Sequence, residues 1–379
     1  TQITAKGRPG ELDSVDNATI IKRNAIASRL MDEHGIDVND LYGLMANKLD
    51  LARGDRFHWS GQAVTIQAKA VTTAIEQALD RPSTPRRHLM DMVFNNLGEP
   101  SQASTFNDPK KLVAWGFNGQ VPHLYVQCAV TFDSLDQDVV PENSEARQWI
   151  AAQAAKVDQR VAEAEAAGIE LYPFTDFLII PRSLQEQYKG ELGDLSIRRP
   201  FVQEVVRAQV GEIFQRFGKL GGLTLRFGET YVHDTPHHVG RSPVREPADH
   251  AILIELLREE ICVKRNKMLF YRTWDFGNNF HVNPEFYQAA TDPIEPHPNL
   301  VFSIKHTRGD FFRTFPFNPT LGVGKHQQIV EVQCQREYEG KSAHPNYIAR
   351  GVIEGFEELA THKRPKCLRD VADHPTFAG

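Results

Sequence analysis

The sequence lacks the features that mark several large classes of protein. Its four cysteines stand far apart and form neither a metal-ligand spacing nor a disulfide framework. It contains no stretch of about 18 apolar residues that could span a membrane. A net charge of −6 argues against a surface for nucleic acid or anionic lipid. We therefore expect no nucleic-acid partner and no insertion into a membrane.

Signals for a metal ion or a cofactor are also missing. His237 and His238 are adjacent, but no third ligand stands at a suitable spacing. No glycine-rich phosphate-binding turn follows the first strand that we predict. We therefore expect neither a metal nor a cofactor.

The composition is ordinary for a globular protein, with 41% hydrophobic and 24% charged residues. A chain of 379 residues predicts two domains or one large one. It begins at Thr1 without a signal peptide and ends at Gly379, where a strand could be starting. We expect both ends to be cut from a longer polypeptide.

Residues 1–80 are predicted to form a small first unit. Asn17 can cap a helix over 18–34, and a short strand is expected at 36–41. A second amphipathic helix is expected over 63–79.

The segment that follows is typical of a linker. Residues 81–87, RPSTPRR, contain two prolines and show no periodicity. We therefore expect a second domain over 88–379.

Strand and helix signals alternate along this second domain. Seven short strands are expected, at 90–95, 114–120, 169–174, 223–227, 268–272, 300–305 and 329–333. Helices are expected at 145–167, 200–217, 247–264 and 346–361. Such alternation predicts parallel strands joined by right-handed crossovers, and therefore an α/β fold.

Two α/β architectures fit this pattern, an open doubly wound sheet and a closed (β/α)₈ barrel of the TIM type. We favour the barrel because the phosphate-binding turn of the open sheet is missing. A barrel needs eight strands, so we expect the eighth to lie beyond Gly379.

Polar side chains gather where the predicted strands end, which is where a parallel barrel places its active site. In strand order the candidate site residues are Asn118, Asp176, Glu229, His233, Arg272, Trp274, Lys305, Asp310 and Glu331.

This combination suits the hydrolysis of a glycosidic bond. One carboxylic acid must protonate the leaving oxygen, and a second carboxylate must attack the sugar or activate water. Glu229, Asp310 and Glu331 can supply these groups. Arg272 and Lys305 add two cations, which a carboxylated sugar needs and a neutral sugar does not.

Other interpretations of these residues stay open. Charged side chains at strand ends can be plain salt bridges. A barrel could bind a carbohydrate without cutting it. An aldolase-type barrel would use Lys305 to form a Schiff base.

Residues 88–379 resemble the barrel of the α-glucuronidases of glycoside hydrolase family 67. The resemblance rests on FGETY at 227–231, the arginine that ends the fifth strand, the spacing of Lys305 and Asp310, and VEVQCQREYEG at 330–340. It implies an inverting hydrolase for an oligo- or polysaccharide that bears uronic acid.

The resemblance also implies a role for each matching residue. Glu229 would be the general acid, and Asp310 and Glu331 would activate the water. Arg272 and Lys305 would bind the carboxylate of the sugar. The other candidates, Trp274, Asn118, Asp176 and His233, would contact the substrate.

The chain departs from that family in its shorter stretch between Asp310 and Glu331 and in its different first domain. A sister family that acts on another acidic polysaccharide fits equally well. A polysaccharide target favours a periplasmic or secreted location, and an oligomer is compatible with the sequence.

Residues 1–80 resemble the C-terminal end of SGNH (GDSL-type) hydrolases, through GIDVNDLYG, the loop DRFHWS and the long helix after it. In that family an aspartate orients a histidine, which activates a serine. The resemblance gives these roles to Asp55 and His58 and implies an esterase. No GDS-like motif precedes residue 80, so we expect the serine upstream. The alternative is that Asp55 and His58 only cap the last helix.

Overall fold

The structure is a computed structural model that describes residues 4, 10–33, 38–53, 55–80, 88–92, 108–228, 232, 234–275, 277, 279–309, 313, 315–332 and 348–379. The chain divides into two compact units, Thr1–Arg86 and Arg87–Gly379.

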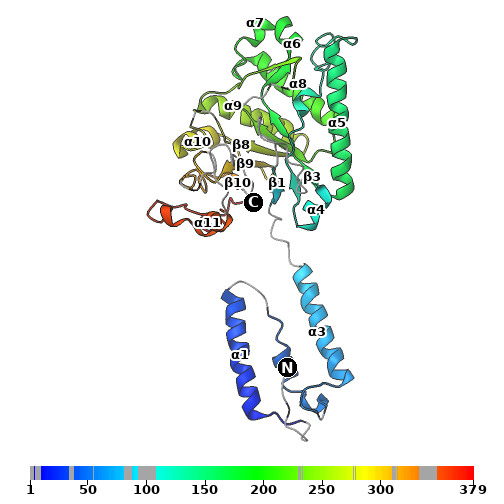
Figure 1. The fold of residues 1–379 in the computed structure, drawn as a ribbon, viewed down its shortest axis with the longest axis vertical. Helices are drawn as coiled ribbons and strands as arrows, with labels where there is room; N and C mark the ends of the chain where they lie inside the picture. The colour runs from blue at the N-terminus through cyan, green and yellow to red at the C-terminus, as the bar shows by residue number, and fades with distance from the viewer. Residues whose placement is uncertain are drawn as a thin grey trace. The chain divides into compact units, whose positions relative to one another are not determined.

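The described part of the first unit is helical. Its helices are α1 (Ser14–Glu33), α2 (Leu41–Met45) and α3 (Gly61–Asp80), with a 3₁₀ turn at Leu49–Leu51 (Figure 1). Helix α1 begins earlier than predicted because Oδ1 of Asp13 accepts the backbone N–H groups of Val15 and Asp16, each at 3.1 Å. Asp13, and not Asn17, is therefore the cap.

The strand predicted at 36–41 is wrong where the structure describes it. Residues 38–40 have no regular structure, and residues 34–37 lie outside the described part. Helix α2 begins at Leu41 because Oδ1 of Asp40 accepts the N–H of Gly43 at 2.9 Å. The hydroxyl of Tyr42 then donates to Oδ1 of Asn17 at 3.3 Å, which ties α2 to α1.

The second unit is built on parallel strands that neighbour one another in chain order. They are β1 (Met90–Asp91), β2 (Gly119–Gln120), β3 (Glu170–Leu171), β4 (Phe174–Asp176), β6 (Gly222–Arg226), β8 (Met268–Arg272), β9 (Leu300–Lys305) and β10 (Gln327–Glu331). The sheet orders are β1-β2-β3 and β4-β6-β8-β9-β10, with every pair parallel. Because β3 and β4 follow each other along one extended segment, the two sheets form one continuous wall.

The last residues of the chain close this wall into a barrel. The N–H of Gln328 in β10 donates to the carbonyl of Thr376 at 2.8 Å, and the N–H of Val330 donates to the carbonyl of Gly379 at 3.0 Å. On the other side, the N–H of His88, just before β1, donates to the carbonyl of Ala378 at 2.7 Å. We expected the eighth strand to lie beyond Gly379, but residues 376–379 occupy its position.

The α/β prediction is confirmed, and β8 and β9 have the predicted bounds. The strand predicted at 114–120 is only partly right, because α4 (Pro109–Ala114) takes up its first residue. Oδ1 of Asp108 caps this helix by accepting the N–H of Lys110 at 3.0 Å, and Pro109 suits its first turn.

The barrel is covered by helices that follow its strands (Figure 1). They include α5 (Glu145–Ala167), α8 (Pro200–Arg216), α9 (Pro247–Leu257), α10 (Pro284–Thr291) and α11 (Ala349–Glu354). Further elements are α6 (Arg182–Gln187), α7 (Lys189–Leu192) and the antiparallel pair β5 (Ile179–Pro181) and β7 (His238–Gly240). None of the helices in the described ranges is long and apolar enough to cross a membrane.

Alternation along the strands decides what lies inside the barrel. The inner apolar cluster consists of Val121, Tyr172, Phe174, Phe270, Val301 and Ile329, and Ala378 also packs against it. Their strand neighbours, such as Leu269, Tyr271 and Phe302, belong to the outer cluster between strands and helices. Because side chains of a strand alternate between its two faces, the inward positions at the carboxyl ends form the floor of the barrel mouth.

Candidate functional site

Six polar residues form this floor in register with one another. They come as strand neighbours: Asp176 beside Arg226, Arg272 beside Ser303, and Lys305 beside Glu331. All six are buried. The parallel register therefore gathers residues that are up to 155 positions apart, from Asp176 to Glu331.

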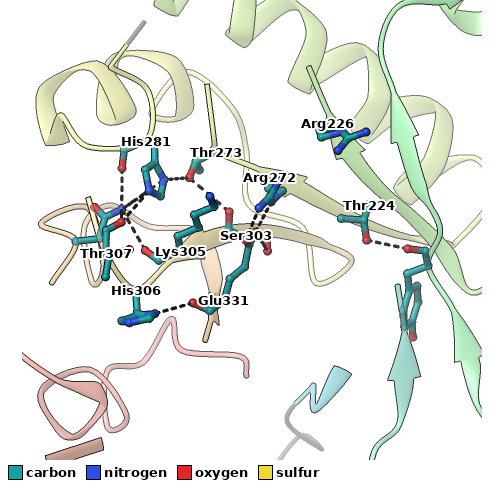
Figure 2. A network of polar contacts seen from close by, with 12 residues as sticks. Thr224, Arg226, Arg272, Thr273, His281, Ser303, Lys305, His306, Thr307 and Glu331 are labelled. Atoms are coloured by element: carbon teal, nitrogen blue, oxygen red, sulfur yellow. Dashed lines mark hydrogen bonds and ion pairs between the residues drawn. The ribbon is translucent and has the colours of Figure 1, made fainter. Parts of the chain in front are cut away.

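Glu331 is a buried carboxylate of the floor that Arg272 and Ser303 hold in place (Figure 2). Nε of Arg272 donates to its Oε1 at 2.7 Å and Nη2 to its Oε2 at 2.8 Å, which is a two-pronged ion pair. The hydroxyl of Ser303 donates to Oε1 at 2.8 Å. Burial acts to raise the pKa of Glu331, but Arg272, Lys305 and Ser303 together outweigh it and leave the pKa lowered. The carboxylate is thus ionised at neutral pH.

Lys305 lies beside this pair and faces an aromatic ring. Its Nζ lies 3.7 Å from the ring centroid of Trp274, a cation–π contact. Lys305 is buried, and Trp274 is partly exposed. A flat ring with a cation against it suits a sugar that carries an anionic group.

A buried histidine joins the segment after β8, through Thr273, to the segment after β9, through Thr307 (Figure 2). The hydroxyl of Thr273 donates to Nδ1 of His281 at 3.0 Å, and Nε2–H of His281 donates to the carbonyl of Thr307 at 3.0 Å. Burial lowers the pKa of His281 to about 3, so the ring is neutral at physiological pH. This neutral form can accept on one nitrogen and donate from the other, as both contacts require.

A second ion pair lies on the neighbouring strands β4 and β6. Nε and Nη2 of Arg226 donate to the two carboxylate oxygens of Asp176 at 2.5 and 2.9 Å. The ring of Phe174 lies close to both arginines, with its centroid 5.4 Å from Cζ of Arg226 and 5.6 Å from Cζ of Arg272. Both arginines of the two ion pairs thus contact one buried aromatic ring.

Three of the predicted site residues lie outside the described part of the chain: Glu229, His233 and Asp310. Asn118 is described but lies away from the mouth. It precedes β2, at the amino-terminal end of the barrel, where its Oδ1 accepts the N–H of Leu89 at 3.0 Å. The structure thus places Asn118 at the opposite end of the strand from the mouth, because α4 delays the start of the strand to Gly119.

Sequence reasoning missed Arg226, Ser303 and His281. Arg226 and Ser303 carried a usable signal in the alternation of their strands. Arg226 stands two residues after the inward-facing Thr224, and Ser303 stands two residues after the inward-facing Val301. His281 carried no such signal, since it reaches the mouth through a loop.

Asp55 and His58 of the first unit form a close pair. Nδ1 of His58 lies 2.7 Å from Oδ2 of Asp55, and both side chains are exposed. Oδ1 of Asp55 accepts the N–H groups of Phe57 and His58, so the pair does not cap α3. Ser60 lies at that position, with its hydroxyl oxygen 3.4 Å from the N–H of Ala63.

Two further features bear on the choice of site. Within the described ranges, no three His, Cys, Asp or Glu side chains are placed to hold a metal ion. A surface groove runs along α8 past Arg207, Glu212 and Lys267. Lys267 directly precedes β8, so this groove lies toward the amino-terminal end of the barrel and is separate from the mouth.

No family model and no curated sequence matches the chain. Similar solved structures include a GH138 enzyme targeting pectin rhamnogalacturonan II, with 14% identity, a TM-score of 0.38, and coverage of 59% of this chain and 25% of that one. Dispersin B has 16% identity, a TM-score of 0.35, and coverage of 60% and 66%. A family 5 glycoside hydrolase from Prevotella bryantii has 11% identity, a TM-score of 0.36, and coverage of 65% and 75%. The chain thus spans less than two thirds of the length of the first two, and likenesses this weak carry no argument about function.

Proposed function

We propose that the second unit is a glycoside hydrolase that removes a uronic acid from an oligo- or polysaccharide, in the manner of an inverting α-glucuronidase. The observation that carries the proposal is the state of Glu331. It is a buried carboxylate at the floor of a barrel mouth, held ionised by Arg272 and directly beside Lys305.

Each proposed role follows from the chemistry of inversion. Glu229, after β6, would protonate the leaving oxygen. Asp310 and Glu331 would orient and deprotonate the attacking water. Because Nε and Nη2 of Arg272 are engaged by Glu331, we assign the carboxylate of the sugar mainly to Lys305, with the sugar ring on Trp274.

The proposal is tested by release of glucuronic or 4-O-methylglucuronic acid from α-linked xylo-oligosaccharides, measured by anion-exchange chromatography. Lys305→Met should lower kcat/KM about 10- to 100-fold, because a charge-assisted contact is lost. The loss should vanish on a substrate whose carboxylate is methyl-esterified. Lys267→Met, which removes a lysine at the amino-terminal end of β8, is the matched control and should have no effect.

Binding of the acidic oligosaccharide without any release would favour the non-catalytic barrel. Release from a different acidic polysaccharide only would keep the hydrolase and change the sugar. Equal losses from Lys305→Met on the free and the esterified substrate would contradict the assigned role of Lys305.

For the first unit we propose that Asp55 orients His58 as the general base of an esterase. The 2.7 Å contact is on Nδ1, which leaves Nε2 to face a serine, as in nucleophile-activating triads. The apolar side chains of Ile26 in α1 and of Val64 and Ile75 in α3 are 53–54% exposed, as in helices that present an apolar face to another element.

The esterase proposal needs a polypeptide in which the serine is present. In it, His58→Ala should lower acetyl release from acetylated xylan by about 1,000-fold or more. Ala substitution of His362, an exposed histidine of the second unit, is the control. Acetyl release that survives His58→Ala would contradict the proposal.

A further inference from the structure

The loop after β2 places two aromatic side chains at the barrel mouth. Val121 belongs to the inner apolar cluster, and His123 follows it by two residues on the same side of the chain. The ring of Tyr125 lies against that of His123, with 4.3 Å between centroids. Both side chains are partly exposed.

Polar contacts hold each of these two rings, His123 through Arg226 and Tyr125 through Asp234. Nη2 of Arg226 lies 3.5 Å from Nε2 of His123, and because arginine only donates, Nε2 is the acceptor. Burial, with the charge of Arg226, lowers the pKa of His123 to about 4, so the ring is neutral at physiological pH. The hydroxyl of Tyr125 donates to Oδ2 of Asp234, in the loop after β6, at 3.3 Å.

The backbone at Tyr125 is in an unusual conformation. Its φ of 48° lies in the left-handed region, which a bulky residue rarely adopts. Such conformations are concentrated at functional sites, where surrounding contacts hold them. Here the contacts to His123 and Asp234 fix the direction of the ring.

Strand order puts this aromatic pair across the mouth from Lys305. Counting the split strand once, β2 is second, β9 is sixth and β10 is seventh in a closed wall of eight positions. The two sides differ in charge. Lys305 and Trp274 offer a cation and a ring, whereas Tyr125 and Asp234 offer a hydroxyl, a ring and a carboxylate that repels an anion.

We propose that His123, Tyr125 and Asp234 form a subsite for a neutral sugar, the one to which the uronic acid is attached. The subsite rests on the proposed function, because it takes the other half of the same substrate. A pyranose ring packs on Tyr125, and Asp234 accepts hydrogen bonds from its hydroxyls. The substrate is thereby oriented with its charged sugar toward β9 and its neutral sugar toward β2.

Calorimetric binding of the two halves tests the subsite without requiring turnover. The charged probe is glucuronic acid, and the neutral probes are xylotriose, cellotriose and galactotriose. Tyr125→Ala should weaken binding of a neutral probe about tenfold and leave glucuronic acid unchanged. Lys305→Met should weaken binding of glucuronic acid and leave binding of the neutral probe unchanged.

Tyr188→Ala is the matched control. Tyr188 is a partly exposed tyrosine whose hydroxyl donates to Oδ2 of Asp136 at 2.6 Å, in the segment after α6. It should alter neither affinity. Asp234→Asn keeps an oxygen that can accept from the hydroxyl of Tyr125, and it replaces Tyr125→Ala as the test if that variant lowers the thermal midpoint of unfolding. It should also weaken binding of the neutral probe only.

The outcomes separate the two proposals. Neutral probes that bind while glucuronic acid does not would support the subsite and contradict the proposed uronic-acid specificity. If Tyr125→Ala weakens both probes equally or neither, the subsite is refuted and the proposed function stands. If no neutral probe binds the unaltered protein, the subsite is also refuted.

Discussion

Removing one partner of the ion pair between Arg272 and Glu331 should destabilise the fold far more than replacing both partners with apolar residues. The two side chains are only 3% and 7% exposed as residues, and two hydrogen bonds join them. Arg272→Met leaves a buried carboxylate without its main partner, which typically costs about 3–5 kcal/mol. The double variant Arg272→Met with Glu331→Leu removes both charges. Its free energy of unfolding should lie within about 2 kcal/mol of that of the unaltered protein.

The pH dependence of the single variant adds a second test. Without Arg272, burial should raise the pKa of Glu331 above its ordinary value of 4.5. A folded-state pKa above the unfolded value means that the folded variant binds the proton more tightly. The loss in free energy of unfolding caused by Arg272→Met should therefore become smaller as pH falls from 7 toward 5. Glu331→Gln cannot titrate and should show no such recovery.

Urea unfolding, followed by near-ultraviolet circular dichroism, measures these free energies, and a double-mutant cycle isolates the pair. The reasoning is refuted if Arg272→Met costs less than about 1 kcal/mol, or if the double variant loses as much as the two single variants summed.

Two further predictions concern the buried histidines. His123, His281 and His306 have pKa values lowered to about 4, 3 and 4 by burial, against 6.5 when unfolded, so the unfolded chain takes up protons first. Stability should fall below pH 6.5 by up to about 1.4 kcal/mol per pH unit for each histidine, and urea midpoints that stay level between pH 7 and 5 would contradict this. His281→Leu should weaken glucuronic acid binding about tenfold by releasing Thr273, which precedes Trp274, and Thr307, which lies two residues after Lys305. His326→Leu, which also loses one contact to a backbone carbonyl, should not, and equal effects of the two variants would count against a positioning role.

Much of the barrel could be predicted because its strands are short apolar runs with clear limits. MLFYR and LVFSIK match β8 and β9 residue for residue. The start of β2 could not be placed, because Trp115 and Phe117 continue the apolar pattern beyond the helix that Asp108 and Pro109 begin. The eighth strand position was missed because Phe377 to Gly379 carry almost no pattern, and their place depends on pairing with β10 and His88.

Part of the site could likewise be predicted from the sequence, and part of it could not. Arg272, Lys305 and Glu331 could be predicted because parallel strands bring their carboxyl ends together. The partners of these residues could not, since an arginine at a strand end can meet substrate or a carboxylate, and only the register decides. His123 and His281 reach the mouth through loops, whose course the local sequence does not specify.

The stereochemistry of sugar release tests the central claim most directly. Proton NMR would follow the anomer that appears from an α-linked glucuronic acid oligosaccharide, with Glu229→Gln as the control. The account predicts release of the β-anomer first, abolished by Glu229→Gln. Release of the α-anomer, or the same release from the Glu229→Gln variant, would contradict it.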